Sequence, residues 1–426
     1  MTRKFTSLLI SALLITALVA CGGGAEPPAG SDAPTAAATQ PPVAAQPTAE
    51  PQVQPTAETR PTAEPQVQPA AEVLPSPAPA VLCPDLPRPA LIVNNGPAFE
   101  AVDAASGTRC DLGLPSATAY PQATGEAVYF VLFDHDAGSS AVYRSGASGP
   151  AEPLESTRVT NDVHYLLRFA LSADGRQLAW AQMQPAEDPN ATELPASLWI
   201  GDAGGGAATA VFENVPGGQM RIVSPIRFSA DGQTLFFTWE PVGLGGMWAS
   251  FNGRYDNLYR VPAGGGEPLK VFDCADADLF LCLGDFRDDG TLAYIDTGKT
   301  IHVNGPDGAE LAAVATASDY AGYPTFSPAG DLFYSEAMVD ESEEMMPLPA
   351  PGTIYRLDAP YSGTPAVVAS GDGLLLSAMR DVFLDGDHVA VNTAEGEQWG
   401  LGLMDAAGAI ARIEPFPNAY LAGILR

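Results

Sequence analysis

The chain has 426 residues, with 51 acidic against 20 basic side chains and a formal net charge of −31 at pH 7. An acidic surface of this kind repels phosphate backbones, so nucleic acid is excluded as an expected partner. The charge is compatible with cation binding but does not by itself demonstrate any.

The N-terminus has the order of an export signal. Arg3 and Lys4 precede an apolar run from Phe5 to Ala20, which is shorter than the roughly 20 residues of a membrane-spanning helix. The run ends in Leu18-Val19-Ala20-Cys21, which resembles the lipobox of bacterial lipoproteins. The resemblance implies a diacylglyceryl group on the Cys21 sulfur and cleavage just before it. The alternative is an ordinary secreted protein with an incidental cysteine.

We therefore expect residues 1–20 to be a lipoprotein signal peptide. The mature protein should be exported and anchored to a membrane through Cys21, outside the cytoplasm, at the cell surface or in the periplasm. Residues 21–82 are rich in proline, alanine and threonine, lack aromatic residues, and repeat the segment 47–55 letter for letter at 61–69. Such a composition has too little apolar bulk to offset the entropy of folding, and it predicts a disordered linker.

Four cysteines remain besides Cys21. In an exported protein an even number favours disulfides, and four residues allow three pairings. The local pairing would join Cys83 to Cys110 and Cys274 to Cys282. Free thiols are the alternative, and no spacing favours zinc.

From residue 83 onward short apolar runs alternate with turns rich in Gly and Asp, a pattern typical of an all-β sandwich or propeller. One unit recurs, in which Phe-Ser-Ala-Asp-Gly or a variant of it separates two apolar runs. Asp-Gly between such runs indicates a hairpin, because the turn needs positive φ. Its clear copies are 169–180, 226–237, 284–294 and 325–334, and its weaker copies are 123–130 and 382–391.

A second unit, strand, Gly-rich turn and strand, follows each copy of the first, and an additional copy begins at Phe99. Together the two units make about 50 residues and four strands, the size of a propeller blade. The sequence contains seven copies of the second unit but only six copies of the first. We expect the apolar strand 418–425 to supply the missing innermost strand and close the ring, so the sequence predicts a seven-bladed β-propeller of four-stranded blades over 83–426.

The Phe-Ser-Ala-Asp-Gly and Phe-Ser-Pro-Ala-Gly units resemble the repeats of TolB-type (WD40-like) β-propellers, most clearly around Ser172, Ser229 and Ser327. The resemblance implies a propeller at the cell envelope that binds other molecules. It does not imply catalysis, because fold-level analogy says little about function.

Three long insertions, 184–195, 240–256 and 339–352, all join the second and third strands of a blade and should project from one face. Long loops on a rigid scaffold commonly carry binding sites. The second insertion places Trp248, Phe251 and Tyr255 among glycines, which suits contact with a glycan or peptide. The alternative is that these aromatic residues fold back onto their own blade. The third contains four acidic residues within 340–344, Asp340, Glu341, Glu343 and Glu344, which could bind a cation or a basic partner or simply form a solvated loop.

The sequence predicts no catalytic residue, no metal ligand and no cofactor. Its histidines, His135, His164, His302 and His388, lie in different blades, and Asp134-His135-Asp136 is better explained as a loop than as a metal site. Serine-hydrolase, zinc-protease, EF-hand and nucleotide-binding motifs do not occur. Prolyl-oligopeptidase-like enzymes join a propeller to a hydrolase domain, whereas this chain ends with its propeller.

We therefore expect a monomeric, non-catalytic binding module with a protein or glycan partner in the envelope. One alternative is a propeller enzyme, a lyase or hydrolase, that acts on polysaccharide through residues at the pore mouth. Another is a purely structural envelope protein.

Overall fold

The structure of the chain is a computed structural model. Contacts divide the chain into two units, Met1–Ala71 and Glu72–Arg426, and all described residues belong to the second. The structure describes residues 83–94, 98–103, 105–115, 117–124, 126–134, 136–146, 150–160, 167–183, 193–219, 221–241, 253–274, 281–318, 320–337, 351–376, 383, 385–386, 388–395, 398–415 and 420–425. The expected signal peptide, Cys21 and the linker therefore lie outside the described residues.

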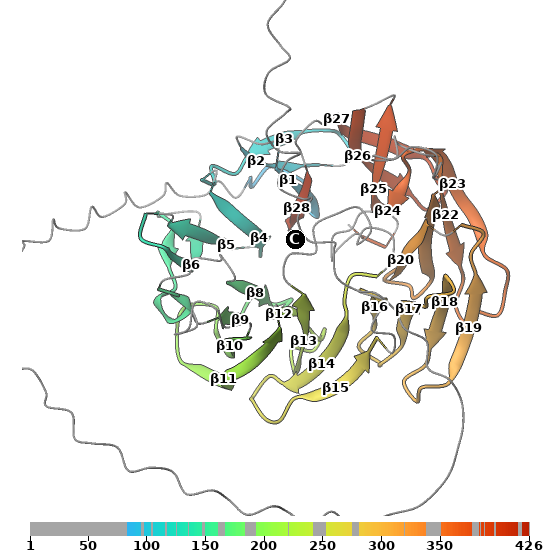
Figure 1. The fold of residues 1–426 in the computed structure, drawn as a ribbon. Coiled ribbons are helices and arrows are strands. Elements are labelled where there is room, and N and C mark those ends of the chain that lie inside the picture. The colour runs from blue at the N-terminus through green and yellow to red at the C-terminus, as the bar shows by residue number, and fades with distance from the viewer. Residues whose placement is uncertain are drawn as a thin grey trace, which may run out of the picture. The chain divides into compact units, whose positions relative to one another are not determined.

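The described strands form the predicted seven-bladed β-propeller of four-stranded antiparallel blades (Figure 1). From the innermost strand outward, blade 1 contains β28 (Tyr420–Leu425), β1 (Ala90–Asn94), β2 (Phe99–Val102) and β3 (Arg109–Asp111). Blade 2 contains β4 (Thr118–Ala123), β5 (Ala127–Asp134), β6 (Ser139–Gly146) and β7 (Glu152–Pro153), followed by a 3-10 turn at Glu155–Thr157. Blade 3 contains β8 (Arg168–Leu171), β9 (Gln177–Met183), β10 (Glu193–Asp202) and β11 (Ala208–Gln219).

The other four blades repeat this order. Blade 4 contains β12 (Arg221–Phe228), β13 (Thr234–Pro241), β14 (Asn257–Pro262) and β15 (Leu269–Asp273). Blade 5 contains β16 (Leu283–Phe286), β17 (Leu292–Ile295), β18 (Thr300–Asn304) and β19 (Glu310–Ala315). Blade 6 contains β20 (Tyr320–Phe326), β21 (Leu332–Ala337), β22 (Pro351–Leu357) and β23 (Ala366–Asp372). Blade 7 contains β24 (Leu375–Leu376), β25 (His388–Glu395), β26 (Gln398–Asp405) and β27 (Ile410–Pro415). Within the described part of the chain, no helix is both long enough and apolar enough to cross a bilayer.

The repeated Ser-Ala-Asp-Gly segment forms the turn between the first two strands of a blade. Gly175 and Gly232 adopt φ of 68° and 70°, a left-handed conformation that glycine adopts without steric cost. In blade 3 the Ser172 hydroxyl bonds to the Asp174 carboxylate at 2.6 Å and accepts the Gln177 N–H at 2.9 Å. The repeat is thus explained by the hydrogen bonding of one hairpin.

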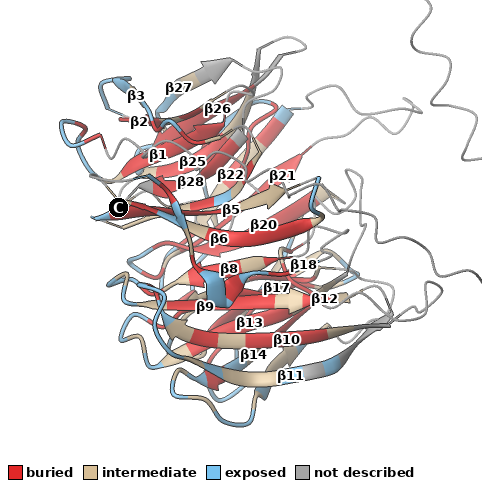
Figure 2. Ribbon diagram, turned by 90° about the vertical axis from the view of Figure 1, so that its left-hand side faces the viewer, coloured by how far each residue is buried: buried red, intermediate tan, exposed pale blue. Residues whose placement is uncertain are grey.

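The hydrophobic core consists of layers between neighbouring blades. Among the described residues, seven buried clusters each combine side chains from two adjacent blades. Phe130 of blade 2 packs in the layer against blade 1, while Tyr129, the next residue to it, packs in the layer against blade 3. Successive residues of a strand point to opposite faces, so the buried stretch of β5 packs on both of its sides (Figure 2).

The C-terminal strand belongs to the first blade. β28 pairs antiparallel with β1, with Leu425 opposite Ala90, and meets β4 of blade 2 in parallel at Ala123. In Figure 1 it lies at the centre of the ring beside β1 and β4. The two ends of the domain thus share one sheet, because β28 supplies the innermost strand of blade 1.

Polar side chains also join neighbouring innermost strands. The Gln122 amide donates to the Phe169 carbonyl at 3.1 Å and accepts the Leu171 N–H at 3.0 Å. At the equivalent repeat position in blade 5, the Asp285 carboxylate accepts the Phe326 N–H of blade 6 at 2.8 Å. Backbone groups that face a neighbouring blade are satisfied in this way.

Candidate functional site

The three long connections begin and end at one end of the blades. They follow β9, β13 and β21, the second strands of blades 3, 4 and 6. Because strands in a blade alternate in direction, this end also holds the start of every innermost strand. We call it the long-loop end. Trp248, Phe251 and the acidic residues 340–344 lie outside the described residues.

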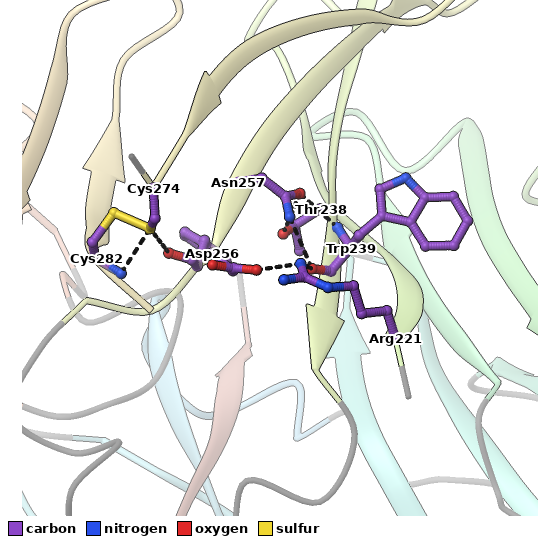
Figure 3. Close-up of a disulfide and its surroundings, with 8 residues drawn as sticks. Arg221, Thr238, Trp239, Asp256, Asn257, Cys274 and Cys282 are labelled. Atoms are coloured by element: carbon purple, nitrogen blue, oxygen red, sulfur yellow. Dashed lines mark hydrogen bonds and ion pairs between the residues drawn. A yellow bond between two sulfur atoms is a disulfide. The ribbon is translucent and has the colours of Figure 1, made fainter. Parts of the chain in front are cut away.

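The residues next to the second of these connections are held together by polar contacts (Figure 3). The Arg221 guanidinium at the start of β12 forms an ion pair with Asp256, which is 5% exposed. The Asn257 amide accepts the Trp239 N–H at 2.8 Å and donates to the Trp239 carbonyl at 3.1 Å. The two strands that bound this connection are thereby joined to each other and to β12.

A disulfide between Cys274 and Cys282 closes the same region, and a second joins Cys83 to Cys110. Tyr255, predicted as an exposed contact residue, is 3% exposed and packs edge-on against Phe286 at a centroid distance of 6.2 Å. The structure therefore differs from the ligand-contact prediction for Tyr255 and agrees with the alternative that it folds back: its ring belongs to the layer between blades 4 and 5. Burial of its apolar ring explains the difference.

An exposed aromatic residue instead occurs on an innermost strand. Tyr120 in β4 is 42% exposed and has a φ of 53°, which is unusual for any residue with a large side chain. The Arg168 guanidinium, at the start of β8 in the next blade, lies 4.4 Å from the Tyr120 ring centroid. This distance is typical of a cation–π contact. We call Tyr120 and Arg168 the axial pair, because both lie on innermost strands at the long-loop end.

Blade 6 contains a buried counterpart. Tyr323 has a φ of 55°, and the Arg254 guanidinium lies 5.4 Å from its ring centroid. Here Tyr323 is only 4% exposed, and Arg254 donates to the Gly284 carbonyl and to the Thr325 hydroxyl at 3.1 and 2.7 Å. This arginine joins three blades, so the counterpart serves the packing of the ring.

Sequence reasoning missed the axial pair. One signal was present: Tyr120-Pro121-Gln122 and Tyr323-Pro324-Thr325 occupy the same place before the repeated turn. A tyrosine followed by proline at equivalent positions in two blades indicates a shared backbone irregularity, and both strands contain a bulge there. The identity of the facing arginine depends on how the blades meet.

The two described histidines, His302 and His388, lie in different blades. His302 in β18 lies between Asp296 and Glu310, with its ring nitrogens 3.1 and 2.9 Å from their carboxylates, and His388 bonds to Asp385 in blade 7. His135 and His164 lie outside the described residues. Among the residues that the structure describes, no group of three or more His, Cys, Asp or Glu side chains is arranged to hold a metal ion.

A cavity of about 430 Å³ lies at the opposite end of the blades, between blades 7 and 1. Arg88, Asp103, His388, Asp405 and Ile410 line it. Its carboxylates stabilise local turns: Asp103 accepts the Ser106 N–H at 3.1 Å, and Asp405 accepts the Ala409 N–H at 2.8 Å. These contacts give both aspartates a structural role in the turns.

No protein-family model matches the sequence, and no curated protein matches it. Similar solved structures include TolB from Acinetobacter baumannii, 13% identical with a TM-score of 0.40, over 79% of this chain and 65% of that one. The periplasmic gluconolactonase of Pseudomonas aeruginosa is 16% identical with a TM-score of 0.43, over 79% of this chain and 96% of that one. The β-propeller domain of the Trilobed protease from Pyrococcus furiosus is 12% identical with a TM-score of 0.43, over 75% and 87%.

The chain thus spans just under two thirds of the Acinetobacter TolB. TolB proteins and an enzyme both occur among these structures, and the likeness is one of fold that carries no argument about function.

Proposed function

We propose that the protein is a lipoprotein of the cell envelope, anchored through Cys21, whose propeller is a non-catalytic binding module for another envelope molecule. The quartet Leu18-Val19-Ala20-Cys21 supports the anchor. The axial pair supports the binding role, and its exposed tyrosine under an arginine is the observation that carries the proposal. Tyrosine and arginine are the residue types that contribute most at binding sites.

The surroundings of the pair favour recognition. Its two strands are joined to each other by the Gln122 amide, and Phe169 of β8 is buried in the layer between blades 2 and 3. A rigid support reduces the entropy lost on binding, which raises affinity. The long connections start at the same end of the blades, and long loops on a scaffold commonly carry binding residues.

The anchor is tested by feeding cells an alkyne fatty acid while they produce the full-length protein. Wild-type protein should carry the label and partition into detergent, whereas Cys21→Ser should do neither. Labelled Cys21→Ser, or unlabelled wild type, would contradict lipidation at Cys21.

The binding role is tested with full-length protein solubilised from its own membrane. After chemical crosslinking in intact cells, a discrete partner should be recovered with wild type and with Arg176→Gln, and at least tenfold less with Arg168→Gln. Arg176 is a matched control, because its side chain is 85% exposed in the turn at the other end of the same blade. Equal recovery with both variants would remove the axial pair as the site. New reducing ends released from envelope polysaccharide by the purified protein would contradict a non-catalytic role.

A further inference from the structure

We propose that the cavity between blades 7 and 1 binds the ammonium group of a small primary amine. The cavity lies at the end of the blades opposite the axial pair, so this inference goes beyond the proposed function and does not depend on it. Three features carry it: a lining that combines apolar walls with carboxylates, a histidine oriented by one of those carboxylates, and an aspartate that its turn engages through one oxygen.

The cavity has the size and the mixed lining of a small-molecule site. Its volume of about 430 Å³ lies within the range of roughly 300–1,000 Å³ that is usual for ligand pockets. Pro87 and Pro89, from the segment before β1, form apolar walls together with Leu403 and Ile410 of blade 7. Ile410 is 37% exposed, so the core leaves hydrocarbon surface uncovered beside the cavity. A short alkyl chain can bury its own apolar surface there.

The charge of the lining selects a cation. Three carboxylates line the cavity against one guanidinium, namely Asp103, Asp385, Asp405 and Arg88. The Ser106 hydroxyl, together with the N–H groups of Ala105 and Ser106, holds the pKa of Asp103 below its ordinary value against the effect of burial. The Arg88 guanidinium donates to the Thr124 carbonyl at 3.2 Å. The cavity therefore has an excess of negative charge, which favours a positive ligand.

His388 offers an acceptor to that ligand. Its Nδ1 lies 3.0 Å from each carboxylate oxygen of Asp385, whose Oδ1 also accepts the His388 backbone N–H at 2.9 Å. Because the carboxylate takes the proton on Nδ1, the neutral ring has its lone pair on Nε2. Within the described part of the chain, Nε2 has no hydrogen-bond partner. A ligand N–H would supply one.

Asp405 offers a second acceptor. Its Oδ1 accepts the N–H groups of Ala407 and Ala409 at 2.9 and 2.8 Å, whereas Oδ2 bonds to none of the described residues. A primary ammonium group has three N–H donors, so it can serve separate acceptors at once, which a quaternary ammonium cannot. A metal ion needs three or more ligands around one point, and the described residues provide no such group.

The test is a titration of full-length protein in nonionic detergent micelles with butylamine, 1-butanol and butyltrimethylammonium, read by saturation-transfer NMR against protein-free micelles. Butylamine should bind at least tenfold more tightly than butanol, which lacks the charge, and than butyltrimethylammonium, which lacks the N–H donors. Nα-acetyl-lysine methylamide presents the same ammonium group on a peptide unit. Weaker binding of this compound than of butylamine supports a free amine as the ligand, and tighter binding supports the same ammonium site with a lysine side chain as its source.

The variants test the residues. Asp405→Asn keeps the oxygen that accepts the turn N–H groups and removes the charge, so it should weaken butylamine binding at least fivefold. His388→Leu should weaken it similarly, and it decides the matter if Asp405→Asn fails to fold. Asp202→Asn is the matched control, because Asp202 also ends the third strand of its blade and accepts a turn N–H, that of Gly204, at 2.6 Å, but does not line the cavity.

Thermal unfolding of each variant separates loss of binding from loss of fold. Equal binding of butylamine and butanol would overturn the inference, because the carboxylates would then have no part in binding. Equal binding of butyltrimethylammonium would reduce the effect to general attraction by an acidic surface, as would equal weakening by Asp405→Asn and Asp202→Asn. Unchanged binding in folded Asp405→Asn and His388→Leu would also overturn it.

Discussion

At the scale of single residues, His302 is the titratable group whose environment is most informative. Its side chain is 17% exposed, stacks on Tyr294 at 4.9 Å and bonds through both ring nitrogens to carboxylates. Burial lowers the pKa of His302, but the hydrogen bonds to Asp296 and Glu310 outweigh it, so the pKa lies above its ordinary value. Only the imidazolium can donate from both nitrogens, so the folded protein favours the charged ring.

This environment predicts a pH-dependent contribution to stability. The folded state holds the proton more tightly than the unfolded state. The stabilisation is therefore complete below the unfolded pKa of about 6.5 and is lost as the pH rises through the higher folded pKa. His302→Gln should lower the urea midpoint at pH 5, by the equivalent of about 1 kcal/mol for partly exposed ion pairs, and change it little at pH 9. A larger effect at pH 9 than at pH 5 would contradict this account.

Tyr120 and Tyr323, which share the same positive-φ irregularity, predict unequal responses to one substitution. Asparagine adopts positive φ more readily than tyrosine, so Asn at either position relieves about 1 kcal/mol of backbone strain. At Tyr120 the loss is an exposed cation–π contact of about 0.5–1 kcal/mol, so the effects nearly cancel. At Tyr323 a buried ring is removed, at a cost of about 3–5 kcal/mol. Urea unfolding should show little change for Tyr120→Asn and a large loss for Tyr323→Asn, and equal losses would contradict the assigned burial.

At the scale of elements, the first blade determines whether the ring stays closed. β1, which pairs with β28, and β2, which pairs with β1, lie inside the loop closed by the Cys83–Cys110 disulfide, with a sequence separation of 27. The Cys274–Cys282 loop has a separation of only 8. A longer loop restricts the unfolded chain more.

Removal of the disulfides should therefore have unequal effects. On loop length alone, Cys83→Ser with Cys110→Ser should lower the free energy of unfolding by about 3.5 kcal/mol. Cys274→Ser with Cys282→Ser should lower it by about 2.5 kcal/mol. The first pair should also release β28, which is measurable as faster hydrogen exchange at Leu421 and Ile424. If the second pair destabilises more, or if exchange in β28 is unchanged, the role assigned to Cys83–Cys110 is wrong.

The elements also show how far the sequence could predict the structure. The propeller prediction is confirmed. It could be made from the sequence because the Ser-Asp-Gly turns depend on local hydrogen bonds that recur from blade to blade. The sequence left two interpretations open for Tyr255, ligand contact and packing within the propeller, and could not decide between them because its packing partner Phe286 lies in the next blade. The contact between Tyr120 and Arg168 likewise joins two blades, and no local pattern specifies such a contact.

At the scale of the whole molecule, the hydrophobic layers that neighbouring blades share make the propeller one structural unit. Each described core cluster draws on two neighbouring blades, so no blade has a core of its own. A substitution in one layer is therefore felt by two blades, whereas a residue exposed at the axis can change with little effect on the fold. Because the exposed residues at the axis are separate from the buried core, substitutions there can test binding without unfolding the domain.

The most direct test of the central claim, that a partner binds at the long-loop end of the axis, is photocrosslinking in intact cells. A benzophenone amino acid is placed at Tyr120, and in a second protein at Ala230, which is exposed in the turn at the opposite end of the blades. The account predicts a discrete crosslinked species from position 120 and none from position 230. No species from position 120, or the same species from both positions, would contradict it.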